Sequence, residues 1–239
     1  INSASKATFL NGFHSYPEDC PQREKAGWTE DACLSAHGSI YNFNTILAYK
    51  KWIQDLMDAQ HESGQVPDIV PTPFWGKPSK VRESPILGQW TEEFVGKMAD
   101  PWWGGVIVLL PWRLYEHYGD PTLLEHTYPA MKKYMAFLLK TTEIALHDYT
   151  YIIDWSTLLG EWLEVGSNGS ANRTPRQLTC TQAFYYYATI IAKIAHLLKE
   201  TEDEKDYYAL SKKIFNAFNE EYLNKTKGIY CEDSQSADA

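Results

Sequence analysis

The fold class is decided by residues 174–223, which begin with TPRQLTCTQAFYYYATIIAKIAHLLK (174–199) and end with DEKDYYALSKKIFNAFNEEYL (203–223). In both stretches apolar residues recur at helical intervals, which predicts two amphipathic helices. Thr174 followed by Pro175 is a usual signal for the start of a helix. Because the segment between the two helices is short, the sequence predicts an antiparallel helical hairpin here.

The same pattern extends toward the N-terminus. Apolar spacing predicts helices within residues 31–60, 102–118 and 123–140, the second of them kinked or interrupted at Pro111. Long loops that carry tryptophan, 67–78 and 141–172, separate some of these helices, and no stretch shows a convincing strand pattern. Hairpins joined in this way predict an all-α fold, an (α/α)6 toroid with its long loops around a pocket. Residues 1–239 are expected to hold about half of that ring, and a small self-contained helical bundle is the alternative.

Composition limits the possible functions. The 239 residues are 44% hydrophobic and 22% charged, which is typical of a globular chain. No apolar run approaches the roughly 18 residues of a transmembrane helix, and a net charge of −9 argues against a nucleic-acid partner. The four cysteines show no paired CxxC spacing, so we expect free buried thiols, although a bridge between Cys20 and Cys33 stays open. The sequence predicts no metal site and no cofactor.

Tryptophan and tyrosine are unusually frequent, with nine and 16 residues. Large aromatic side chains with polar edges serve in cores, and their flat faces also stack on sugar rings. The most specific stretch surrounds one of them and reads DCPQREKAGWTED at 19–31. It crowds charged side chains around Trp28 with almost no aliphatic residue to bury. Such surroundings push the pKa values of carboxyl groups apart and can yield one acid and one base.

This stretch resembles a motif of the α-L-rhamnosidases of glycoside hydrolase family 78, which has the form DCPQRDERLGWTGDA. The match covers residues 19–32, is one residue shorter after Arg23, and aligns on the Gly-Trp pair. The resemblance implies that Glu24 is the general acid. It also implies that Asp19, Trp28 and Asp31 line the rhamnose pocket, and Arg23 is a further expected substrate contact.

Weaker similarities to the same family extend over essentially the whole chain. They are WGGVIVLLPW at 103–112 followed by Tyr115 and YGD at 118–120, GEWL at 160–163, and SQSA at 234–237. The resemblance makes Trp103, Glu161 and Trp162 expected substrate contacts. Gly105 stands where the family usually has an aspartate.

The family resemblance implies an (α/α)6 barrel that hydrolyses terminal α-linked L-rhamnose with inversion. Inversion needs two carboxyl groups roughly 6.5–9.5 Å apart. The family's base follows the SQSA region, so it is expected beyond Ala239, and residues 1–239 are expected to be the N-terminal half of the catalytic domain and inactive alone. The expected partners are a rhamnose-containing oligo- or polysaccharide and the remainder of that domain. The compartment, whether periplasmic, secreted or cytoplasmic, stays open.

Two other functions stay open. The same barrel could be a lyase that removes rhamnose from a glucuronate, which requires a base and a cationic group such as Arg23 or Lys25. The chain could also be a non-catalytic carbohydrate-binding segment. Weaker candidates for sugar contacts lie in the long loops: Trp75, Glu92, Glu93, Asp154 and Trp155.

Two expectations about geometry follow from the hydrolase interpretation. The loops that hold Trp28, Trp103 and Trp162 should converge on one face with the acidic motif. Glu24 should have a raised pKa, because a general acid must be protonated before it reacts.

Overall fold

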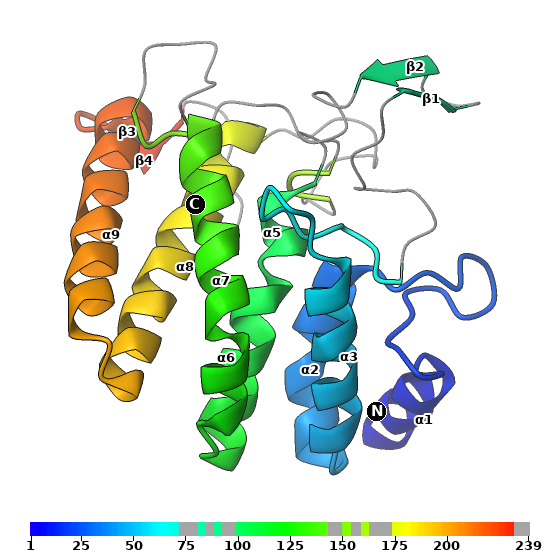
Figure 1. Ribbon diagram of the computed structural model, residues 1–239. Helices are drawn as coiled ribbons and strands as arrows, with labels where there is room; N and C mark the ends of the chain where they lie inside the picture. Colours follow the sequence, from blue (N-terminus) through cyan, green and yellow to red (C-terminus); the bar gives the residue numbers. More distant parts are fainter. Residues whose placement is uncertain are drawn as a thin grey trace. The chain divides into compact units, whose positions relative to one another are not determined.

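The computed structural model describes residues 1–71, 81–84, 88–91, 99–142, 150–153, 159–162 and 174–231. The chain divides into two compact units, Ile1–Ala99 with Trp103–Tyr134, and Asp100–Trp102 with Met135–Ala239. Helices predominate in both, which confirms the predicted all-α class (Figure 1). None of the helices in the described ranges is long and apolar enough to cross a membrane. The weaker candidates at 75, 92, 93, 154 and 155 lie outside the described residues.

The first unit is built on helices α1 (Asn2–Asn11), α2 (Thr29–Asn42), α3 (Ile46–Ala59) and α6 (Val106–Tyr118). Helix α6 packs against both α2 and α3, and α1 lies against α2 (Figure 1). Large apolar side chains fill the interior of this unit. Trp52, Ile53 and Leu56 of α3 and Leu110 of α6 are fully buried. Packing on α6 holds α2, whose first turn contains Glu30 and Asp31 of the charged motif, against this interior.

Two predicted helices differ from the observed ones. Residues 31–60 form α2 and α3 instead of one helix, because Phe43 adopts an extended backbone with φ −142° and ψ 156°. Helix α6 runs through Pro111 without a break, and the interruption lies at Gly105, between α5 (Pro101–Gly104) and α6. Gly104 allows close packing against Tyr134, since a Cβ there would lie 2.7 Å from the Tyr134 hydroxyl. The buried residues around Pro111 offset the hydrogen bond that proline cannot donate.

The second unit contains the predicted hairpin. Helix α8 (Arg176–Leu198) and helix α9 (Thr201–Tyr222) lie side by side (Figure 1). Lys199 ends α8 in the left-handed conformation with φ 63°, and the Glu200 amide donates to the Ala195 carbonyl at 2.9 Å. This closes the helix in the manner of a Schellman cap. Helix α7 (Thr122–Thr142) contributes residues to both units.

The described residues include four short strands that the sequence did not predict. Strand β1 (Val81–Ser84) pairs antiparallel with β2 (Gly88–Thr91), and β3 (Leu223–Asn224) pairs with β4 (Ile229–Tyr230). Strands of two to four residues are too short to show the alternating pattern that predicts a strand. All four cysteines are free, so Cys20 and Cys33 form no bridge. Cys33 and Cys180 are buried as expected, whereas Cys20 and Cys231 are half-buried.

Candidate active site

The charged motif is held in place by the segment that follows α3. The amide of Val70 donates to the Gly27 carbonyl at 2.8 Å, and the Thr29 amide donates to the Asp68 carbonyl at 2.9 Å. Trp28 forms a β-bridge with Ile69 between these two bonds. A Cβ on Gly27 would lie 2.2 Å from the Val70 carbonyl oxygen, so the two backbones meet at a distance that only glycine permits. The position of Trp28 is therefore fixed on both sides.

Thr29 connects this loop to the start of the α5–α6 region. Its Oγ1 lies 2.8 Å from the Trp103 carbonyl oxygen and 3.0 Å from the Asp68 carbonyl oxygen, and the residue is fully buried. The predicted convergence of the Trp28 and Trp103 loops is thus confirmed within the first unit. Trp162 belongs to the second unit, and its convergence with the other two stays a prediction.

Glu24 lies at the end of a tight turn. The amides of Arg23, Glu24 and Lys25 all donate to the Cys20 carbonyl, at 3.1, 3.0 and 2.9 Å. This turn aims the Glu24 carboxyl at Trp28, whose indole Nε1 donates to Oε2 at 2.7 Å. Arg23 Nη2 donates to the other oxygen, Oε1, at 2.6 Å. Both oxygens of the candidate acid therefore accept hydrogen bonds.

These contacts overturn the expectation that the pKa of Glu24 is raised. The hydrogen bond from Trp28 lowers the pKa of Glu24 most strongly, and the hydrogen bond and positive charge of Arg23 lower it further, against the opposing effect of burial. The sequence places charges of both signs around Glu24, and it does not show that Arg23 is the one that turns toward the carboxyl. In this structure Glu24 is a stabilised carboxylate.

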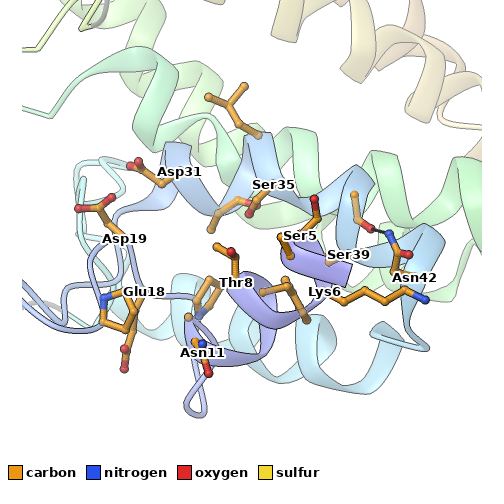
Figure 2. Close-up of a pocket in the computed structure, with 18 of the residues that line it drawn as sticks. Ser5, Lys6, Thr8, Asn11, Glu18, Asp19, Asp31, Ser35, Ser39 and Asn42 are labelled. Carbon is orange, nitrogen blue, oxygen red and sulfur yellow. Dashed lines mark hydrogen bonds between the residues drawn. The ribbon is translucent and has the colours of Figure 1, made fainter. Parts of the chain in front are cut away.

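Asp19 and Asp31 lie next to each other at one end of a groove between α1 and α2 (Figure 2). The groove has a volume of about 980 Å³, which is at the upper end of the range of roughly 300–1,000 Å³ for small-molecule sites. Asp31 is accessible to water and lines this groove, where neighbouring residues surround its carboxyl group. Burial by the surrounding chain, together with the negative charge of Asp19, raises the pKa of Asp31 to about 6. The raised pKa thus belongs to Asp31, and the sequence analysis expected it at Glu24.

One group of possible metal ligands exists among the described residues. Atoms of Asp19, Cys20 and Glu24 lie within 4.8 Å of one another. Arg23 occupies this place, since its Nη2 lies 3.7 Å from the Cys20 sulfur and also contacts Glu24. A metal ion would have to displace the Arg23 guanidinium. These three side chains are therefore better suited to binding the arginine than to binding a metal ion.

Trp103 is the second tryptophan of the first unit that the motifs singled out. Its side chain is buried, with 7% exposed, and its indole Nε1 meets no acceptor within the described part of the chain. A buried indole N–H ordinarily finds a partner.

The sequence analysis missed Asp100, which organises the corresponding loop of the second unit. Its carboxylate accepts from the amide of Trp102 at 2.9 Å and from the amide of Gly160 at 2.9 Å, and the residue is fully buried. Asp100 thereby positions half-buried Glu161 and exposed Trp162, which follow Gly160. The signal was present, because Asp100-Pro101 is the same helix-start pair as Asp120-Pro121.

Comparison with known proteins agrees with this arrangement. The model of the bacterial alpha-L-rhamnosidase 6 hairpin glycosidase domain matches residues 1–239. An alpha-L-rhamnosidase of Formosa agariphila is 30% identical over 216 residues, which are 90% of this chain and 21% of that protein. The structure of an alpha-L-rhamnosidase from Dictyoglumus thermophilum is 33% identical, with a TM-score of 0.76 over 94% of this chain and 22% of that one.

A third match is the Streptomyces avermitilis alpha-L-rhamnosidase, whose structure is described as complexed with L-rhamnose. It is 27% identical, with a TM-score of 0.70 over 94% of this chain and 19% of that one. These similarities confirm the six-hairpin fold class. The chain spans about a fifth of the length of these relatives.

Proposed function

Because the chain belongs to the bacterial alpha-L-rhamnosidase six-hairpin glycosidase family, we propose that it forms part of an enzyme that hydrolyses terminal α-L-rhamnosides. The observation that carries this proposal is the family match over residues 1–239 together with the cluster of Asp19, Glu24 and Asp31 in one site. Carboxyl groups gathered in one site are the usual equipment of a glycosidase. The substrate is a rhamnose-containing oligo- or polysaccharide.

In the proposed mechanism Glu24 protonates the leaving oxygen as the general acid, and a second carboxylate activates water for inversion. The two groups of an inverting glycosidase stand roughly 6.5–9.5 Å apart. We assign residues 1–239 to the N-terminal half of an (α/α)6 catalytic domain, and the general base to the part that follows. The small share of the relatives that the chain covers supports this assignment.

The remaining site residues bind the sugar in this proposal. Asp19 and Asp31 accept from sugar hydroxyls at the end of the groove. Trp103 is a further sugar contact in this proposal, because Thr29, next to Trp28, donates a hydrogen bond to its carbonyl. Arg23 and Trp28 act on Glu24 itself. Glu161 and Trp162, held by Asp100, offer a carboxylate and a flat aromatic face.

The test uses the longer protein that contains this chain and an aryl α-L-rhamnoside. We expect release of rhamnose, which proton NMR should detect first as the anomer opposite to that of the substrate. A product with a new double bond, detected by its ultraviolet absorbance, would instead show a lyase. Saccharide binding without any turnover would show a carbohydrate-binding module.

A further inference from the structure

The two carboxylate oxygens of Glu24 accept hydrogen bonds from donors that differ greatly in how exposed they are. Trp28 is half-buried and lies between the buried residues Gly27 and Thr29, so its indole stays in place. Arg23 has 74% of its side chain exposed and reaches Oε1 of Glu24 from the solvent side. One hydrogen bond is therefore part of the folded loop, and the other can be released without unfolding anything.

This difference bears on where a proton can be held. A general acid carries its proton on a carboxyl oxygen before it reacts. An oxygen that accepts from a guanidinium at 2.6 Å is in its ionised form, because charge-assisted hydrogen bonds of this length favour the carboxylate. Trp28 stays on Oε2 in the folded loop, whereas Arg23 can vacate Oε1, so Oε1 is the oxygen that takes up the proton in this proposal.

We propose that Arg23 is a positioning residue that keeps Glu24 ionised in the empty site and leaves Oε1 when the sugar binds. The inference rests on the proposed function of Glu24 as general acid. On binding, one proton from the solvent adds to Oε1 and gives the neutral carboxyl group. That proton then passes to the glycosidic oxygen as the bond to the sugar breaks.

The other charged groups around Glu24 are compatible with this role. Asp19 forms a hydrogen bond that lowers the pKa of Glu24 after the larger effects of Trp28 and Arg23. The Cys20 thiol has a pKa raised chiefly by its hydrogen bond to Asp19, so it remains neutral. Asp31 carries a raised pKa that the charge of Glu24 increases slightly. Once Arg23 has left, no cation remains among these groups beside Glu24. The Trp28 hydrogen bond still lowers the pKa of Glu24, and the bound sugar opposes it by adding to the burial of the carboxyl.

The first test measures the pKa of Glu24 by carbon NMR of this chain labelled at glutamate carboxyl groups. We expect Arg23→Gln to move the titration of Glu24 to higher pH, and Arg23→Lys to restore most of the difference. Lys25→Gln is the matched control, since it removes a neighbouring positive charge whose side chain makes no described contact with Glu24. The Trp28 indole proton reports whether each variant keeps the folded loop. An unchanged Glu24 titration in folded Arg23→Gln overturns the proposal.

The second test measures proton uptake in the longer protein that contains this chain. Rhamnose is added in buffers of different ionisation enthalpy, and calorimetry then gives the number of protons bound. We expect uptake in the wild type at the acidic pH values where Glu24 titrates, and less uptake there in Arg23→Gln, whose Glu24 already holds more protons in that range. In the pH profiles, kcat should decrease at a higher pH than kcat/KM does. The difference between these two pH values should be smaller in Arg23→Gln.

The two proposals fail in different ways. If the protein hydrolyses rhamnosides but the wild type and Arg23→Gln take up equal numbers of protons, the role proposed for Arg23 is wrong and the proposed enzymatic function stands. If the Glu24 titration changes in Arg23→Gln but the protein hydrolyses no rhamnoside, the effect of Arg23 on Glu24 stands and the proposed function is wrong.

Discussion

The indole Nε1 of Trp28 donates a hydrogen bond of 2.7 Å to Oε2 of Glu24, four residues earlier in the chain. A large aromatic ring that packs its face against a carboxyl group excludes water and raises the pKa of that group. The structure shows the opposite effect, because the polar edge of the ring faces the carboxylate and lowers its pKa. Trp28 thus fixes one oxygen of Glu24 and leaves the other to Arg23.

The close approach at Gly27 predicts a loss of stability when a side chain is added. A methyl group there would lie 2.2 Å from the Val70 carbonyl oxygen, which is itself the acceptor for the Trp52 indole at 3.0 Å. We expect Gly27→Ala to lower the free energy of unfolding by about 1–3 kcal/mol, as overpacking does. Urea unfolding followed by tryptophan fluorescence measures the change.

Gly38 supplies the control for this variant. It lies within α2, and a Cβ there would meet nothing within 4 Å. Gly38→Ala should raise the stability by roughly 0.5–1 kcal/mol, since glycine is unfavourable inside a helix. Equal effects of the two substitutions would mean that the approach of Gly27 to Val70 does not constrain the loop.

The hydroxyl of Thr29 is predicted to matter for the loop that carries Trp103. Thr29→Val keeps the shape and removes the only side-chain donor described for the Trp103 carbonyl. Leaving a buried acceptor unsatisfied costs about 1–3 kcal/mol. Thr189→Val, at an exposed position of α8 whose hydroxyl bonds to Tyr185, is the control and should change stability little. Similar unfolding curves for both variants would contradict the role assigned to Thr29.

The raised pKa of Asp31 predicts how the free energy of unfolding depends on pH. Its pKa rises from an ordinary value of 3.8 to about 6 on folding, so between these values the folded state holds more protons than the unfolded state. Stability therefore falls as pH rises through this window. We expect the wild type to lose stability relative to Asp31→Asn between pH 3.8 and about 6, with no further divergence above it. Urea midpoints at a series of pH values measure this, and Asp58→Asn on the exposed face of α3 controls for the loss of one negative charge.

Helix periodicity predicted most of the fold, because α8 and α9 follow a strong repeat of apolar residues with clear ends. The break between α2 and α3 was missed because Phe43 is apolar and fits the helical repeat, while its extended backbone depends on tertiary packing. Pro111 was expected to interrupt its helix. Packing of the buried residues around it carries the helix through.

The site was only partly accessible from the sequence. Residue types and spacing brought Asp19, Glu24, Trp28 and Asp31 together, because they belong to one short segment. The sequence could not show which charged side chain turns toward Glu24, since adjacent Arg23 and Lys25 point according to the turn at Cys20. Asp100 was missed because its two hydrogen-bond partners include Gly160, which is distant in the sequence.

The most direct test of the central claim compares the wild-type enzyme with Glu24→Gln, in the longer protein, on rhamnosides with good and poor leaving groups. The amide keeps the shape of the carboxyl and cannot donate its proton as an acid. We predict a loss in kcat of about 10²–10⁴-fold on poor leaving groups. The loss should be much smaller on a nitrophenyl rhamnoside, which needs little protonation. An equal loss on both substrates would contradict the account, because it would make Glu24 a binding or structural residue.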